Sequence, residues 1–314
     1  MPVFENTPQG RAMREIVAHF HADNRLGKRM KNGEFQKNLA EPEWKLPEGY
    51  TLTMVETQNF VMELLEPEDC EGQVLLLQLH GGGYISGMRN VYRNFAHRYS
   101  ELGGRIPVMT PDYRVAPEHP YPAALEDASV AWHCLLDTGW RPEQIIMAGD
   151  SAGGGLAMAL CMFLKDQGEA LPAGLIAMSP WTDLTLSGES YETNYHKDPV
   201  FGNTRDSMIF SNDYPQQEDR TNPYISPLFG DFTGFPPMLV QVGSYEMLLS
   251  DAEAAARKAK EAGVKVRLSI YEGMFHVFQM AMGVIPESRL AWKEVRKFLD
   301  IIREDLPESH YDTE

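Results

Sequence analysis

Short apolar runs alternate with helical segments over most of this 314-residue chain. The run "VLLLQLH" at 74–80 has almost no polar position, which is typical of a strand buried on both faces of a sheet. Comparable runs stand at 106–110, 144–149, 174–180 and 237–243, and helical stretches separate the first four of these five runs. This alternation predicts an α/β fold with a mostly parallel central sheet flanked by helices.

Other segments complete this prediction. The first 25 residues are expected to be helical, because Met13, Ile16, Val17 and Phe20 recur at helix spacing. Residues 181–224, here called the insertion, interrupt the alternation with a long, polar and aromatic stretch. We expect the insertion to lie over one end of the sheet. Further helices are expected near 90–102, 122–137, 152–167, 250–262 and 286–304, and further strands within 50–67 and 264–272.

Charge and cysteine content exclude some functions and favour a location. The formal net charge of −17 repels phosphate backbones, so we expect no nucleic-acid partner. The three cysteines show no CxxC or Cys/His spacing, which argues against a disulfide framework or a metal site. Reduced thiols and the lack of a signal-like start favour a cytoplasmic protein. No window approaches 18 uninterrupted apolar residues, so no membrane span is expected.

The segment "IIMAGDSAGGGLAMAL" at 145–160 runs from a strand through a glycine cluster into a helix. G-x-S-x-G at such a junction is typical of a nucleophile elbow, which exposes a serine on a strained turn. We expect the glycines at 149 and 153–155 to leave open space around Ser151, because glycine has no Cβ. Ser151 is therefore the candidate nucleophile. The alternative is a glycine-rich loop with an incidental serine.

Three consecutive glycines follow the buried strand in "QLHGGGYISG" at 78–87. Backbone N–H groups of such a loop can hold the oxyanion of an acyl-transfer intermediate, and we assign these donors to Gly82, Gly83 and Ala152. A phosphate-binding loop is disfavoured because neither GK[ST] nor GxGxxG is present. A purely structural loop remains an alternative. His80 is expected to support the loop by hydrogen bonding.

A serine nucleophile needs an adjacent base at neutral pH. Of the nine histidines, His276 follows the last predicted strand, which gives the chain order Ser–acid–His expected of this architecture. Glu246 lies in the loop directly after the strand 237–243, where its side chain can reach His276. Asp251 is the alternative acid, although a role at the start of the next helix explains it equally well. We favour Glu246.

Together these motifs resemble the hormone-sensitive-lipase-like branch of the α/β-hydrolases. They stand here as "HGGG" (80–83), "GDSAGG" (149–154), "YEMLLSD" (245–251) and "FHVF" (275–278), within a resemblance that covers roughly residues 50–305. One departure is that the family commonly has Asp-Pro in the acid loop, where this chain has Glu246-Met247. Because glutamate is one methylene longer, this loop is expected to sit slightly further back.

The resemblance implies an α/β-hydrolase fold with a helical cap. The cap would comprise residues 1–45 and 181–224, and the catalytic domain residues 46–180 and 225–314. It also implies hydrolysis of small carboxylic esters with short acyl chains through Ser151, His276 and Glu246. No metal and no organic cofactor is implied, and homodimers are frequent in the family. A set of apolar side chains would either line a pocket or form the core of the cap: Phe20, Trp181, Tyr191, Tyr195, Phe201, Met208 and Phe210.

Two other functions are compatible with the same scaffold. One is an amidase or peptidase, although the chain lacks the added propeller domain of the prolyl peptidases. The other is a non-catalytic small-molecule receptor, as in the plant gibberellin receptors, which resemble this family but have lost the histidine. The presence of Ser151, an acid and His276 favours the ester hydrolase.

Overall fold

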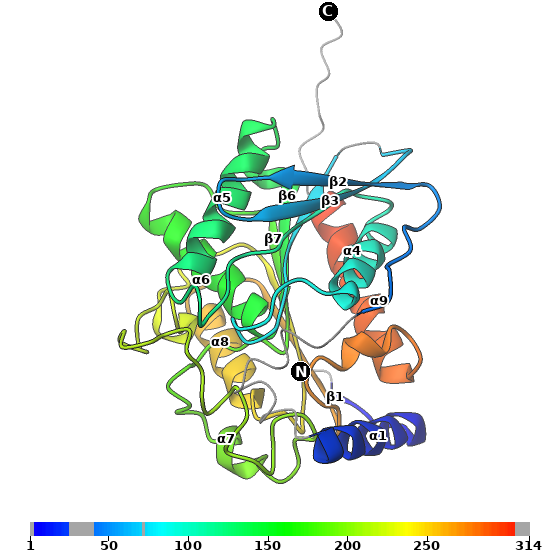
Figure 1. The fold of residues 1–314 in the computed structure, drawn as a ribbon, viewed down its shortest axis with the longest axis vertical. Coiled ribbons are helices and arrows are strands. Elements are labelled where there is room, and N and C mark those ends of the chain that lie inside the picture. Colours follow the sequence, from blue (N-terminus) through cyan, green and yellow to red (C-terminus); the bar gives the residue numbers. More distant parts are fainter. Residues whose placement is uncertain (1–2, 25–40, 71–72, 305–314) are drawn as a thin grey trace, which may run out of the picture.

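The computed structural model describes residues 3–24, 41–70 and 73–304 (Figure 1). In this part of the chain the strands form one sheet, in the order β1-β9-β8-β7-β6-β4-β5-β3-β2. The strands are β1 (Val3–Phe4), β2 (Tyr50–Glu56), β3 (Val61–Pro67), β4 (Leu75–Leu79), β5 (Val108–Pro111), β6 (Ile145–Asp150), β7 (Gly174–Met178), β8 (Met238–Gly243) and β9 (Val266–Tyr271).

The sheet is parallel from β1 through β5 in this order, and only the last two pairings, β5 with β3 and β3 with β2, are antiparallel. Every residue of β4, β6, β7 and β8 is buried, as the continuous apolar runs indicate. The predicted α/β class with a mostly parallel sheet is therefore confirmed.

Helices cover both faces of the sheet (Figure 1). The α-helices are α1 (Pro8–Asn24), α4 (Asn90–Leu102), α5 (Ala123–Asp137), α6 (Ala152–Asp166), α7 (Ser190–Thr193), α8 (Leu249–Glu261) and α9 (Pro286–Glu304), and the 3-10 helices are η1 (Pro142–Gln144), η2 (Pro227–Phe229) and η3 (Phe278–Ala281). Side chains of β4 alternate between two cores: Leu75 and Leu77 pack with α5, α6 and α8, and Leu76 packs with α4 and α9. Among the described helices, none combines the length and apolar character needed to cross a bilayer.

The N-terminal segment is attached to the far edge of the sheet. Strand β1, which the sequence analysis does not predict, pairs in parallel with β9, and Phe4 stacks on Tyr271 with ring centroids 4.4 Å apart. Arg14 of α1 then donates to the carbonyl oxygen of Gly273 at 2.8 Å. These contacts bring α1 beside the loop that follows β9 (Figure 1). Residues 25–40, which include part of the expected cap, lie outside the described residues.

The insertion contains α7 and a series of turns. Asn212 donates to the carbonyl oxygen of Gly83, after β4, at 2.7 Å, and Asn194 donates to that of Ser244, after β8, at 3.0 Å. These partners follow the carboxyl ends of two parallel strands. The insertion therefore contacts the end of the sheet at which ligands bind in open α/β folds.

Candidate active site

Ser151 occupies the single residue between β6 and α6. Its backbone has φ 52° and ψ −123°, a left-handed conformation that strains a residue with a Cβ. Two hydrogen bonds hold this turn: the Ser151 N–H donates to Met178 O at 2.8 Å, and the Trp181 N–H donates to Ser151 O at 2.9 Å. The expected strained turn is therefore present.

The glycines around Ser151 act differently from our expectation. They do not border open space, because a Cβ at Gly153 would overlap the carbonyl oxygens of Leu79 and His80. A Cβ at Gly149 would likewise overlap the carbonyl group of Gly153. The glycines thus allow the start of α6 to pack directly against the ends of β4 and β6, and this close backbone contact supports the strained turn.

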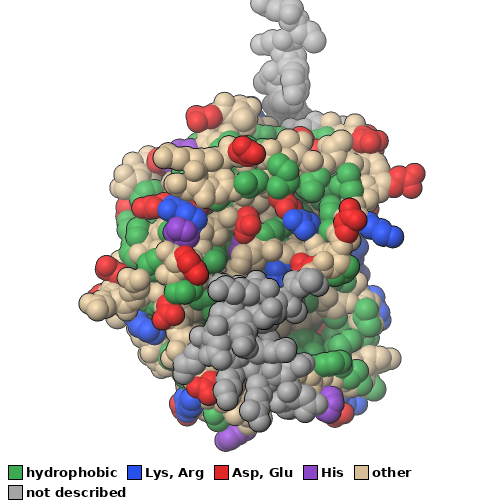
Figure 2. Space-filling model, in the orientation of Figure 1, with side chains coloured by type: hydrophobic (Ala, Val, Ile, Leu, Met, Phe, Trp, Pro, Cys, Tyr) green, Lys and Arg blue, Asp and Glu red, His purple; other side chains and the backbone are tan. Residues whose placement is uncertain are grey.

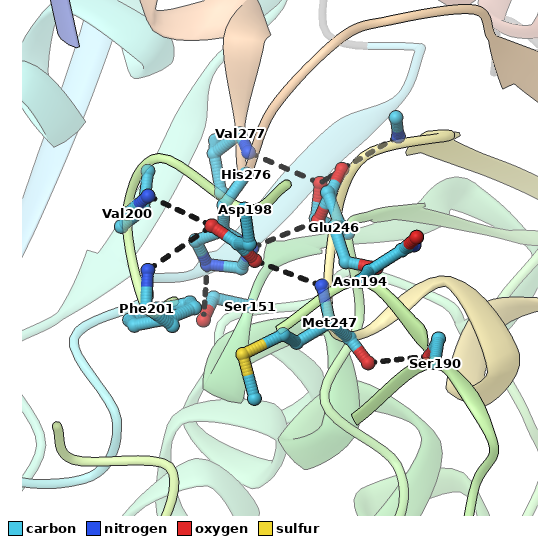
Figure 3. Close-up of polar contacts among 12 residues, drawn as sticks. Ser151, Ser190, Asn194, Asp198, Val200, Phe201, Glu246, Met247, His276 and Val277 are labelled. Atoms are coloured by element: carbon cyan, nitrogen blue, oxygen red, sulfur yellow. Dashed lines mark hydrogen bonds and ion pairs between the residues drawn. The ribbon is translucent and has the colours of Figure 1, made fainter. Parts of the chain in front are cut away.

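The three residues predicted from distant parts of the chain form one hydrogen-bonded series (Figure 3). Ser151 Oγ lies 2.9 Å from His276 Nε2, and His276 Nδ1 lies 2.9 Å from Glu246 Oε2. A carboxylate accepts hydrogen bonds, so Nδ1 carries the proton and Nε2 is free to accept the Ser151 hydroxyl proton. Glu246 is fully buried, and this carboxylate fixes the orientation of the imidazole.

The second oxygen of Glu246 is also held. Glu246 Oε1 accepts the Gly243 N–H at 2.6 Å and the Ser179 hydroxyl at 2.8 Å, while Ser179 Oγ accepts the Val277 N–H at 3.1 Å. Sequence reasoning missed Ser179. The signals were its position at the end of β7, between the strand ends that carry Ser151 and Glu246, and its place in "SPWTDLT" (179–185), a segment that also resembles the hormone-sensitive-lipase-like family.

Asp251, the alternative acid, is not brought to the histidine. Its Oδ2 accepts the N–H groups of Thr182 and Asp183 at 2.9 and 2.8 Å. It is buried in the first turn of α8, and this burial raises the pKa of its carboxyl well above the usual range. Asp251 joins the start of the insertion to α8, whereas the side chain near His276 is Glu246.

The loop after β4 borders the same site. Gly82 and Gly83 have φ of 115° and 65°, which glycine adopts without strain, and both line a cavity together with Ser151. Within the described residues, their N–H groups donate to no protein acceptor. The third assigned donor, Ala152, is the first residue of α6 and directly follows Ser151. These positions leave N–H groups available beside the hydroxyl.

The side chains of His80 and Asp150 support this loop by hydrogen bonds to the backbone of Gly81. His80 is fully buried, donates from Nδ1 to Gly81 O at 2.7 Å and stacks on Tyr113, with ring centroids 4.1 Å apart. Its expected supporting position is observed. Asp150 Oδ1 accepts the Gly81 N–H at 3.1 Å. Burial raises the pKa of the Asp150 carboxyl to about 7, against the opposing effects of His276 and the Gly81 N–H.

The cavity above Ser151 has a volume of about 520 Å³ and a mostly apolar lining. Met13 and Val17 of α1 contribute to it, as do Phe201 and Met208 of the insertion. Of the seven apolar side chains considered from the sequence, only Phe201 and Met208 line this cavity, whereas Phe20 is exposed. Across the described residues, no group of three or more His, Cys, Asp or Glu side chains has the arrangement of a metal site.

Comparisons with known proteins agree with this geometry. A family model described as the alpha/beta hydrolase fold matches residues 76–280. An acetyl-hydrolase of Streptomyces hygroscopicus is 39% identical over 237 residues, which span 76% of this chain and 78% of that protein. An esterase of Acinetobacter venetianus is 39% identical over 226 residues, 71% of this chain and 74% of that protein.

Solved structures give the same result. A crystal structure of an esterase from the bacterial hormone-sensitive lipase family superposes with a TM-score of 0.81 at 32% identity, covering 96% of this chain and 100% of that one. A crystal structure of EstE5 soaked with p-nitrophenyl butyrate gives 0.82 at 31% identity, covering 95% and 99%. The chain therefore belongs to the α/β-hydrolase-fold family, in its hormone-sensitive-lipase-like branch. The expected enzyme class, an esterase on this fold, is confirmed.

Proposed function

We propose that this chain is a serine hydrolase that cleaves short-chain acyl esters through Ser151, His276 and Glu246 and an acyl-enzyme intermediate. The observation that carries the proposal is the continuous series of hydrogen bonds from Ser151 Oγ through His276 to Glu246, each 2.9 Å long. Its first member borders an apolar cavity of about 520 Å³.

In the acylation step, His276 Nε2 removes the hydroxyl proton as Ser151 Oγ attacks the ester carbonyl carbon. The negative charge of Glu246 stabilises the imidazolium that forms and keeps Nδ1 protonated. The Ser151–His276 distance of 2.9 Å allows direct proton transfer.

The tetrahedral intermediate then carries a negative oxygen. In our proposal, the N–H groups of Gly82, Gly83 and Ala152 hold this oxyanion. Each such donor lowers the barrier by about 3 kcal/mol, because it is already oriented before the charge develops. His276 next protonates the leaving alcohol, and water hydrolyses the acyl-enzyme by the same sequence of proton transfers.

Two observations support short acyl esters as substrates. The cavity lining is mostly apolar, and its volume of about 520 Å³ accommodates a short acyl ester. One relative is named an acetyl-hydrolase, and crystals of the similar EstE5 were soaked with p-nitrophenyl butyrate. Residues 1–45 and 181–224 would act as the cap over this cavity, because Met13, Val17, Phe201 and Met208 from these segments line it.

The remaining expectations are part of the same proposal. Cys70, Cys134 and Cys161 are free thiols, which supports a cytoplasmic setting. On the face shown in Figure 2, outside the grey residues, Lys and Arg are scattered among Asp and Glu without a continuous basic surface. This distribution supports the absence of a nucleic-acid partner. A homodimer rests on the family resemblance alone.

The test is a series of p-nitrophenyl esters from acetate to palmitate, with a matched anilide. We expect the highest kcat/KM on acetate or butyrate and far slower cleavage of the anilide. A maximum on palmitate would contradict short-chain specificity, and comparable rates on the anilide would indicate an amidase. A receptor without catalysis would neither turn over an ester nor be labelled by a fluorophosphonate.

A further inference from the structure

Asp198 is a buried carboxylate near the triad for which the mechanism above has no role. It lies in the insertion, is 1% exposed, and among the described residues pairs with no lysine or arginine. Its oxygens instead accept three backbone N–H groups. Oδ1 accepts those of Val200 and Phe201 at 2.7 and 3.0 Å, and Oδ2 accepts that of Met247 at 2.8 Å. One carboxylate thus joins two segments that are distant in sequence.

The first of these segments is the acid loop, residues 244–248. Met247 directly follows Glu246, so the hydrogen bond that its N–H donates to Asp198 fixes the backbone next to the triad acid (Figure 3). Asn194 donates to the carbonyl oxygen of Glu246 at 2.8 Å, and Ser190 Oγ donates to that of Met247 at 2.6 Å. The insertion therefore holds the acid loop at several successive backbone groups.

The second segment is the cavity wall at Val200 and Phe201. Both residues line the cavity above Ser151. The Phe201 ring packs on the His276 imidazole, with centroids 4.7 Å apart and an interplanar angle of 57°. Because Asp198 holds the N–H groups of both wall residues, it fixes the backbone that carries this ring (Figure 3).

We propose that Asp198 is a positioning residue for ester hydrolysis, which keeps the acid loop and the Phe201 wall in the arrangement that holds His276 between Ser151 and Glu246. It touches no reacting atom and acts through Met247 and Phe201. This inference rests on the proposed function and adds to it a role of the insertion in holding the triad.

Asp251 provides a matched control. It is equally buried, and its carboxylate also accepts backbone N–H groups of the insertion, from Thr182 and Asp183 at 2.9 and 2.8 Å. No hydrogen bond in the described part of the chain joins Asp251 to Glu246 or His276. Its replacement therefore reports the loss of a buried carboxylate without a link to the triad.

The experiment measures kcat and KM for p-nitrophenyl butyrate in D198N, D251N, E246Q and the double variant D198N/E246Q. Active sites are counted with a fluorophosphonate, and folding is followed by thermal unfolding. In D198N the Asn amide cannot accept all three N–H groups, so we expect kcat to fall by about tenfold or more, with KM within about threefold. D251N is expected to lower the unfolding temperature similarly but to keep kcat within about twofold of wild type.

The double variant distinguishes positioning from general destabilisation. If Asp198 acts through the acid loop, D198N costs less than about threefold in kcat once Glu246 is already replaced, because coupled residues are not additive. The inference would be overturned if the losses of kcat in D198N and E246Q multiply in the double variant. Equal kcat in D198N and D251N would overturn it as well. If D198N does not accumulate as folded protein, D198E is put through the same cycle, with the same expected and contrary results. A wild-type protein that cleaves no ester would overturn the proposed function itself, which is a distinguishable result.

Discussion

The hydroxyl of Ser179 donates a 2.8 Å hydrogen bond to Oε1 of Glu246, the carboxylate oxygen that His276 does not contact. The same hydroxyl oxygen accepts the N–H of Val277 at 3.1 Å. One serine at the end of β7 therefore links the Glu246 carboxylate directly to the backbone next to His276. Bonds of this kind to a charged group are stronger than bonds between neutral groups, so the side chain should matter for turnover.

Replacement of Ser179 by alanine should lower kcat/KM for a short ester by about tenfold, because a hydrogen bond to a charged group is worth roughly 1.5–3 kcal/mol. Steady-state kinetics on p-nitrophenyl butyrate measures this. Ser226→Ala is the control, since Ser226 is also fully buried and accepts the Leu184 N–H at 2.9 Å away from the triad. Equal losses of activity in the two variants would remove the special role of Ser179.

Glu246→Gln should reduce kcat by about 10³-fold or more, because a neutral amide neither stabilises the imidazolium nor enforces the correct tautomer. Asp251→Asn should leave kcat nearly unchanged and lower stability. Comparison of the two folded variants on one ester checks the assignment. If the ranking is reversed, Asp251 is the triad acid.

Gly153→Ala should prevent the native elbow from forming, since the added Cβ would overlap the carbonyl oxygens of Leu79 and His80. We expect little soluble protein, or folded protein without activity. Gly168→Ala is the control: its φ is 74°, but nothing lies within 4 Å of the new Cβ. There only the backbone penalty of about 1 kcal/mol applies. Wild-type activity in Gly153→Ala would refute the close-packing explanation.

Asp150→Asn should change how stability depends on pH. Burial raises the pKa of Asp150 to about 7, so between pH 4 and 7 the native state keeps a proton that the unfolded chain releases. This group therefore makes the wild type less stable as pH rises through that range. The stability of the variant relative to wild type should increase across it, by roughly 2–4 kcal/mol, and level off above pH 7.

Urea unfolding between pH 4 and 8 measures this difference. Asp231→Asn is the control, because Asp231 is exposed and pairs with Lys165, which lowers the pKa of its carboxyl. For that variant the difference from wild type should be flat above about pH 5, since the carboxyl is ionised in both states there. If the difference in unfolding free energy between Asp150→Asn and wild type is also independent of pH, the Asp150 carboxyl is not protonated in the native state near neutral pH.

Much of the fold could be predicted because its central strands are continuous apolar runs separated by helices. Strand β1 could not, since Val3 and Phe4 have no periodicity and pair with Ile270 and Tyr271 at the other end of the chain. The glycine cluster was correctly placed at the elbow. Its role in close backbone packing, however, appears only when Gly153 meets the end of β4.

The juxtaposition of Ser151, Glu246 and His276 could be predicted because each lies at most five residues after a strand, and parallel strands bring their carboxyl ends together. Ser179 and Asp198 could not. Each makes its contacts between segments that are far apart in the sequence, so its partners are not visible in the sequence. The insertion has no regular hydrophobic pattern, so its contacts with the acid loop could not be derived from the sequence.

The central claim is that the Ser151 hydroxyl is a nucleophile activated by His276. The most direct measurement is mass spectrometry of the chain after reaction with a fluorophosphonate, together with hydrolysis of p-nitrophenyl acetate, in wild type and in folded Ser151→Ala. We expect one adduct on Ser151 in wild type, and neither adduct nor turnover in the variant. Wild-type turnover by Ser151→Ala, or an adduct on another residue, would contradict the account.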